Sequence, residues 1–405
     1  MRIIATAAAA ILLTAPTAGP QAPRPLSRAD ALDAALARGA RLGLARSDTT
    51  LAAADVTSAH ALPNPSLSAS YSKSVPQLHL TAEFPIDYAS VRSTRIQAAD
   101  AGRVAAGFRF AFDRASVALD ADTSYTRAVA ALEHATLSRR NALDADSLRK
   151  LAVARRADGD ASDLEVELAT LNAGQQANIA ADDSSAAVSS LLDLQSLIGE
   201  ATDRVAIQPS DSLAMPPDAL TPARVDSTLP VGAAAMSLHA ADLGAALERR
   251  SIWGMPSVLV GLETRDPTGA ERGILPTLGF SLPFPLLDKN RGAIAVADAE
   301  RDRAQAELAL ARVETEADIA RAARLRQLAL AKIARDTTLI ADANRLSSMA
   351  LDAYREGAST IPTVLEAQRN AREQRGQLID DLAAAWIATA ELRVFQLTPS
   401  SLPPK

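Results

Sequence analysis

Long stretches of the chain carry the apolar spacing of helices. Residues 90–156 and 290–355 are rich in Ala, Leu, Arg and Asp and contain no proline. A helix of about 65 residues would be about 100 Å long. Breaks containing glycine follow at 158–160 and 356–358, and helical patterns resume over 162–198 and 360–397. Shorter helices are predicted over 26–61, with Ser27 as the N-cap, and over 231–250.

One helix carries a regular apolar stripe. Leu339, Ala343, Leu346, Ala350 and Ala353 follow one another at intervals of four and three residues. That spacing predicts a coiled-coil seam, and its alanines favour long, thin packing with closely spaced helices.

Four short segments alternate with period two instead, which is typical of strands. Their apolar positions are Leu67, Ala69 and Tyr71; Leu78, Leu80, Ala82 and Phe84; Val258, Val260 and Leu262; and Ile274, Leu278, Phe280 and Leu282. The segments form two pairs, so we expect two β-hairpins. Residues 207–230 are rich in Pro, Asp and Ser, and predict a connector with little regular structure.

The order of these elements occurs twice. The strand ends FPID at Phe84 and LPFP at Leu282 lie 198 positions apart, as do Gly159 and Gly357. A shared offset together with a shared order predicts an internal duplication. We therefore expect a first repeat over 23–204, an equatorial connector over 205–230, a second repeat over 231–397 and a C-terminal tail over 398–405.

The first 22 residues predict a cleaved secretory signal. Met1 and Arg2 give a positive start, residues 3–13 are apolar, and small residues and prolines follow up to Ala22. The alternative is a buried helix start, and the run is too short to span a bilayer. No later run reaches about 18 apolar residues, so we expect an exported protein without a transmembrane helix.

Composition narrows the chemistry. The chain has no cysteine, which excludes disulfides, thiolate metal sites and thiol catalysis. Its net charge of −6 without a basic stripe argues against nucleic acid as a partner. The four histidines, His60, His79, His134 and His239, are scattered and form no HExxH pair. We expect no enzyme activity, no cofactor and no metal site.

Aromatic residues gather at the predicted hairpins. Six of the thirteen lie in or beside them: Tyr71, Phe84, Tyr88, Trp253, Phe280 and Phe284. Such rings favour a membrane–water interface; the alternative is a small sheet packed on the helices in water. A sheet in a membrane needs closed edges, and closed barrels start at about eight strands. If these four strands enter a bilayer, several copies must therefore share them.

Specific segments resemble the TolC family of outer-membrane efflux proteins. They are LPNPSLSASYS at 62–72, LLDLQSLIGE at 191–200, SLPFPLLDKNRGAI at 281–294 and the two glycine-centred breaks. The similarity spans 26–397 and is greatest to the heavy-metal and cation branch typified by CzcC. It implies a mainly α fold with a small β part. In that fold, long antiparallel helices form a trimeric α-barrel, and two hairpins per protomer are pooled into an outer-membrane β-barrel.

The resemblance also implies a function and partners. The protein would be the passive exit duct of a tripartite efflux system for small molecules or cations. It would lie in the outer membrane of a Gram-negative-type cell, in contact with its lipid, and extend into the periplasm. A periplasmic adaptor and an inner-membrane pump such as an RND transporter would complete the machine. The alternative is an exported periplasmic coiled-coil scaffold.

Two groups of residues match the family's functional positions. The adaptor-docking tip would comprise Arg156, Asp158 and Gly159 at one break, and Arg355, Glu356 and Gly357 at the other. A periplasmic gate would comprise Glu366 and Thr363, with Asp163 and Glu165 beside them. Thr363 departs from the acidic pattern, which puts a double acidic ring in doubt. The ordinary alternatives are helix C-caps at the glycines and acids that complement helix dipoles.

Overall fold

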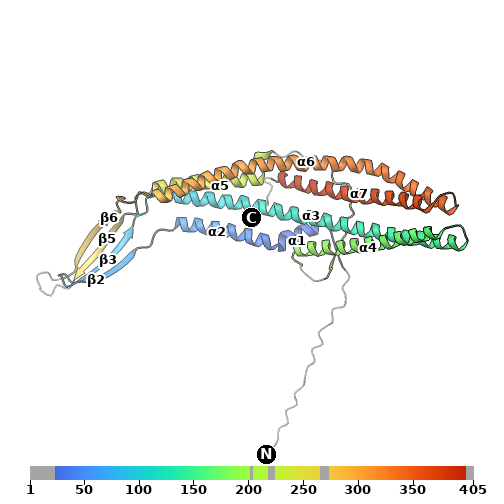
Figure 1. Ribbon diagram of the computed structural model, residues 1–405. Coiled ribbons are helices and arrows are strands. Elements are labelled where there is room, and N and C mark those ends of the chain that lie inside the picture. Colours follow the sequence, from blue (N-terminus) through green and yellow to red (C-terminus); the bar gives the residue numbers. More distant parts are fainter. Residues whose placement is uncertain (1–22, 201–203, 218–223, 265–272, 398–405) are drawn as a thin grey trace, which may run out of the picture.

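The structure, a computed structural model, describes residues 23–200, 204–217, 224–264 and 273–397. They form an elongated helical bundle with a small sheet at one end (Figure 1). The predicted signal peptide at 1–22 and the tail at 398–405 lie outside the described residues.

Two very long helices run along the bundle, as predicted. They are α3 (Ala89–Ala157) and α6 (Arg291–Arg355). In the half away from the sheet, α4 (Asp163–Leu197) packs on α3 and α7 (Ile361–Gln396) packs on α6. In the half near the sheet, α2 (Ala40–His60) packs on α3, and α5 (Leu229–Arg250) packs on both long helices. The same order of elements thus occurs in both halves of the chain, while its origin by duplication stays a prediction.

Alanine dominates the helix contacts. Most of the buried apolar residues in the described ranges are alanines, among them the fully buried Ala121, Ala128, Ala145 and Ala385, and large side chains such as Tyr125 are the minority. Small side chains let helix axes approach closely. The bundle is therefore held by long, narrow seams, as the composition predicts.

The predicted seam of α6 is partly wrong. Its buried residues are Ala329, Ile333, Asp336, Ala350 and Tyr354, a heptad pattern. The two predicted leucines, at positions 339 and 346, are 48% and 53% exposed. Because leucine is more apolar than alanine, the sequence pattern favoured burial of the leucines. Within the chain, however, α6 buries the face that packs against α7. The leucines lie on a neighbouring face that this chain leaves uncovered.

The two predicted hairpins are present and join into one sheet. Its strands are β2 (Ser66–Tyr71), β3 (Leu78–Pro85), β5 (Ser257–Thr264) and β6 (Leu275–Ser281), in the order β2-β3-β5-β6. All neighbours are antiparallel, and β3 and β5 pair from Leu78↔Thr264 to Pro85↔Ser257. Among the described residues, β2 and β6 have no partner on their outer edges.

The connector is more regular than predicted. β4 (Ile207–Pro209) pairs in parallel with β1 (Arg24–Leu26), and a 3₁₀ turn covers Val225–Ser227. The paired segments are about 180 residues apart in the chain, so no local pattern reveals the pairing. The helix predicted over 26–61 is also interrupted. α1 (Arg28–Arg38) ends at Gly39, where a Cβ would lie 2.4 Å from the Ala35 carbonyl oxygen.

A polar cluster fastens the start of the chain to the helices near mid-length. The Tyr125 hydroxyl on α3 lies 2.7 Å from Asp211 Oδ2 and 2.9 Å from the Leu26 carbonyl oxygen. Burial and the Asp211 carboxylate raise the pKa of Tyr125 to about 12. The Arg28 guanidinium pairs with Asp122 and lies 4.1 Å from the Trp386 ring centroid on α7. The first residue of α1 thereby contacts both α3 and α7.

Candidate functional site

The two glycine breaks lie together at the end of the bundle opposite the sheet (Figure 1). Gly159 has φ +87° and Gly357 has φ +76°. Backbone bonds close each turn, from Asp160 N to Arg155 O and from Ala358 N to Ala353 O, both 2.8 Å. These are Schellman caps, in which glycine takes the left-handed position. The breaks are thus helix C-caps, and together they form the tip of the molecule.

Arg155 joins the two turns, a role that the sequence did not reveal. Its guanidinium donates to the Tyr354 carbonyl oxygen, lies 4.6 Å from the Tyr354 ring centroid, and donates to the Asp160 carbonyl oxygen at 3.2 Å. Tyr354 is fully buried in an apolar cluster with Leu148 and Ile361. Nothing in the linear pattern separates Arg155 from Arg156, because its partner lies 199 residues away.

The predicted docking residues form an exposed, charged surface around this joint. Arg156 donates to Asp163 Oδ1 at 2.6 Å, and this hydrogen bond lowers the pKa of Asp163. Arg355 pairs with Asp352 at 3.0 Å. Asp158 and Glu356, each the C-cap of its helix, are exposed. The tip therefore offers both signs of charge on two adjacent turns.

The predicted gate residues lie near this tip, and most have local partners. Glu366 on α7 is exposed and pairs with Arg369 at 2.8 Å. Thr363 Oγ1 lies 3.3 Å from Thr360 Oγ1. Glu165 accepts from the Ser162 backbone N–H at 3.2 Å in a capping box. Acids near helix starts complement the dipole here, and within one chain the gate residues form no shared cluster. In the part of the chain that the structure describes, no group of three or more His, Asp or Glu could hold a metal ion.

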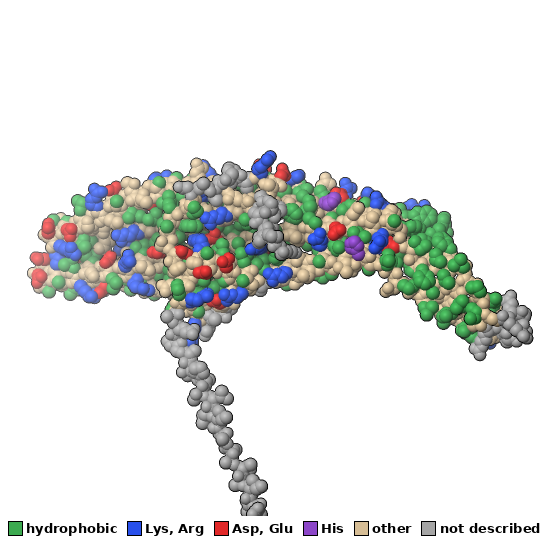
Figure 2. Space-filling view, turned by 180° about the vertical axis from the view of Figure 1, so that it is seen from behind, with side chains coloured by type: hydrophobic (Ala, Val, Ile, Leu, Met, Phe, Trp, Pro, Cys, Tyr) green, Lys and Arg blue, Asp and Glu red, His purple; other side chains and the backbone are tan. Residues whose placement is uncertain are grey.

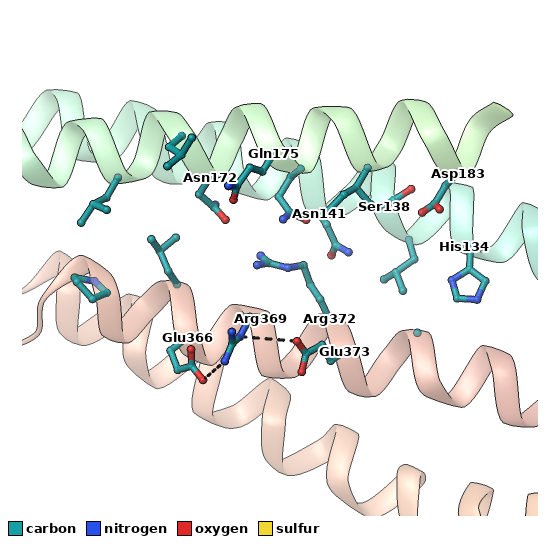
Figure 3. A pocket seen from close by; sticks show the side chains of 18 residues that line it. His134, Ser138, Asn141, Asn172, Gln175, Asp183, Glu366, Arg369, Arg372 and Glu373 are labelled. Atoms are coloured by element: carbon teal, nitrogen blue, oxygen red, sulfur yellow. Dashed lines mark hydrogen bonds and ion pairs between the residues drawn. The ribbon is translucent and has the colours of Figure 1, made fainter. Parts of the chain in front are cut away.

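A cleft of about 660 Å³ opens beside Glu366, between the α3–α4 pair and α7. Arg369 lies at its edge between Glu366, at 2.8 Å, and Glu373, at 3.8 Å (Figure 3). Arg372 extends from α7 across the gap toward α4 (Figure 3). The sequence did not single out this cleft, because its walls come from segments that are far apart in the chain.

The predicted interface aromatics are mostly exposed on the sheet or beside it. Exposed fractions are 61% for Tyr71, 47% for Phe84, 63% for Phe280 and 62% for Phe284, while Tyr88 is partly buried as the N-cap of α3. Trp253 meets Phe284 edge to face at 5.5 Å. Apolar side chains cover this end of the molecule, whereas charged ones are spread over the helices (Figure 2).

None of the helices in the described ranges is long and apolar enough to cross a bilayer.

Comparisons with known proteins show which families and solved structures this chain is similar to. Residues 263–395 match the sequence model of the family described as "Outer membrane efflux protein". A search of curated proteins finds no match.

Solved structures match over nearly the whole chain. The outer membrane protein VceC from Vibrio cholerae is 17% identical with a TM-score of 0.76, covering 91% of this chain and 95% of that one. A membrane protein from Pseudomonas aeruginosa is 19% identical with a TM-score of 0.79, covering 91% and 93%. The outer membrane channel CmeC from Campylobacter jejuni is 15% identical with a TM-score of 0.75, covering 91% and 85%. Residues 263–395 therefore match the outer membrane efflux protein family, the chain has the fold of these channels over 91% of its length, and its resemblance to the TolC family is confirmed.

Proposed function

We propose that this protein is the outer-membrane channel of a tripartite efflux system, a passive exit duct for small molecules or cations. The observation that carries the proposal is the four-stranded sheet at one end of the helical bundle. Its two outer edges have no partner strand among the described residues, and it exposes large apolar side chains, among them Leu67 and Leu278 at 73% and 82%. Such a sheet is costly in water and incomplete in a bilayer.

Closure of the sheet requires further copies of the chain. Three copies of a four-stranded sheet would supply twelve strands, which exceeds the minimum of about eight for a closed barrel. Pairing β2 of one protomer with β6 of the next would satisfy every open edge. The long helices would then be pooled as well, and their exposed leucine faces would meet a neighbouring protomer. The resemblance to the TolC family implies three copies, and therefore a homotrimer with a β-barrel above an α-helical tunnel.

The opposite end supplies the proposed partner surface. The two turns around Gly159 and Gly357 are exposed, adjacent and fixed by Arg155, so they form a preorganised docking site for a periplasmic adaptor. An inner-membrane pump such as an RND transporter would supply the energy. Next to the tip, Glu366 with Thr363, Asp163 and Glu165 would narrow the passage and favour cations.

Cross-linking between edge strands tests this assignment. The chain has no cysteine of its own, so Ser68→Cys on β2 can be combined with cysteines at successive β6 positions around Thr277. We expect one register to give covalent dimers and trimers in the outer-membrane fraction. The ladder should stop at three copies, because a closed ring has no further edge.

The control is Ser68→Cys alone, which should give no trimer. A chain that fractionates as a water-soluble monomer, with no cross-link in any register, would contradict the channel assignment and favour the periplasmic scaffold.

A further inference from the structure

The cleft beside α7 brings together four polar side chains that form no hydrogen bond or ion pair within the described residues. Asn141 on α3 and Asn172 on α4 lie on one side, and Arg372 on α7 extends toward them across the gap (Figure 3). Gln176 on α4 also lines the cleft. Apolar side chains complete the walls, among them Leu168, Leu171 and Leu365. An open cavity of about 660 Å³ is large enough for a small organic molecule.

Arg372 is the unusual member of this group. It is partly buried, and it makes no hydrogen bond or ion pair with any residue that the structure describes. Burial lowers the pKa of its guanidinium, while the Glu373 and Asp144 charges act in the opposite direction. Arginine nevertheless stays charged in proteins. A partly desolvated, unpaired guanidinium gains more from an anion than a fully hydrated one does.

The carboxamides opposite are also unsatisfied. Asn172 is 9% exposed and its Nδ2 has no hydrogen-bond partner. Asn141 and Gln176 are 7% and 8% exposed, and their side chains make no hydrogen bonds within the described ranges. An amide can present either its donor or its acceptor after a half-turn of its terminal torsion. All three can therefore turn donors toward a negative group held by Arg372.

The acidic side chains that line the cleft form no ion pair with Arg372. Glu366 and Glu373 both pair with Arg369, at 2.8 and 3.8 Å. Asp183 lies on α4 toward the far end of the cleft, near His134 (Figure 3). Asp144 also acts on Arg372 by its charge, but no ion pair joins them among the described residues. The lining as a whole holds three carboxylates and two guanidiniums, and the part between Arg372 and the amides is where a guanidinium without an ion-pair partner and several amide donors lie together.

We propose that this cleft binds a small organic carboxylate. The carboxylate would accept from the Arg372 guanidinium, whose planar fork fits two oxygens at once, and from the amides of α3 and α4. An apolar body attached to it would lie against the leucines of the walls. The inference needs neither a trimer nor transport, because every group named belongs to one chain.

Fluorine NMR of the purified full-length protein in detergent, titrated with para-fluorobenzoate, tests the proposal. We expect a saturable shift or broadening of the probe signal. Arg372→Gln should weaken binding about tenfold or more, the equivalent of about 1.4 kcal/mol. Asn172→Leu should weaken it severalfold. The neutral analogue para-fluorobenzyl alcohol should neither bind comparably nor displace the probe.

The matched control is Arg345→Gln, which removes an exposed arginine on α6 that pairs only with Asp342 and lies outside the cleft. It should leave the affinity unchanged, and circular dichroism should show that all variants are folded. The proposal is overturned if the wild-type protein shows no saturable binding, if Arg372→Gln binds as tightly as the wild type, or if the neutral alcohol binds equally well.

Discussion

At the scale of single residues, carboxyl groups buried between the helices destabilise the fold when they are ionised. Asp336 on α6 and Asp381 on α7 are 6% and 4% exposed, and Lys332 Nζ lies 3.1 Å from Asp381 Oδ1. Burial, and then the hydrogen bond with Asp381, raises the pKa of Asp336. The folded chain therefore holds this proton more tightly than the unfolded chain does. Ionising Asp336 destabilises the fold as the pH rises, and this penalty disappears as the pH falls through the raised pKa.

Asp336→Asn should therefore raise the melting temperature at pH 7, by on the order of a few degrees. The amide keeps the shape and can donate a hydrogen bond to Asp381 without a second buried charge, and Lys332 still pairs with Asp381. The gain should shrink as the pH falls through the raised pKa of Asp336. Thermal unfolding over a pH series from 7 downward measures both effects, with exposed Asp342→Asn as the control. A lower melting temperature at pH 7 would show that the charge is favourable where it lies.

Residue roles were predictable where they depend on near neighbours. Ser27 is an N-cap, and Gly159 and Gly357 take the left-handed position directly after the C-caps of α3 and α6, as expected, because capping is decided within four or five positions. Arg155 and Arg372 could not be recognised. One acts through a partner 199 residues away and the other through a cleft formed by three helices.

At the scale of elements, the hydrophobic period indicated every long helix and all four strands of the sheet. Departures occur where backbone geometry or distant pairing decides. The first helix is interrupted at Gly39, where the backbone leaves the helical conformation at φ −60° and ψ 121°. β1 and β4 form because residues 24–26 and 207–209, far apart in the chain, lie side by side in the fold. The helix ends at the tip follow local rules, so their energetics can be tested by substituting glycines.

Gly357→Ala should destabilise the protein by about 1–2 kcal/mol, because alanine is strained at positive φ. Its new Cβ would also lie 3.4 Å from Arg155 Nη2, whereas a Cβ at Gly159 would meet nothing within 4 Å. Gly159→Ala thus isolates the backbone cost, and the excess in Gly357→Ala reports the disturbed Arg155 contact. Thermal unfolding combined with limited proteolysis at the tip measures both.

A third glycine supplies a control of opposite sign. Gly174 lies inside α4 with open space around it, so Gly174→Ala should stabilise by about 0.5–1 kcal/mol. Equal effects at all three positions would rule out the left-handed caps as the cause.

At the scale of the whole molecule, the two ends have opposite characters. The sheet end is apolar with open edges, and the tip is charged with capped turns (Figures 1 and 2). This polarity fits a duct that is anchored in lipid at one end and docked in water at the other. Glu366 is the proposed gate acid that lines the cleft, and its exposed carboxylate pairs with Arg369.

Glu366→Ala should raise single-channel conductance in planar bilayers and weaken cation preference, each on the order of twofold, because a narrow passage loses its ring of negative charge. Glu300→Ala, an exposed position on α6, is the control and should change neither. Unchanged conductance and selectivity in Glu366→Ala would remove this residue from the gate.

The sequence by itself determined the helices, the strands, the caps and the family resemblance, because periodicity, turn chemistry and short motifs are properties of neighbouring residues. Only the tertiary structure decided which face of α6 is buried, that two hairpins about 175 residues apart share one sheet, and that Arg155 and Arg372 have special surroundings. The physical reason is the same in each case. These features depend on contacts between segments that are far apart in the chain. A local pattern shows that a residue can make a contact, but it does not show which residue the partner is.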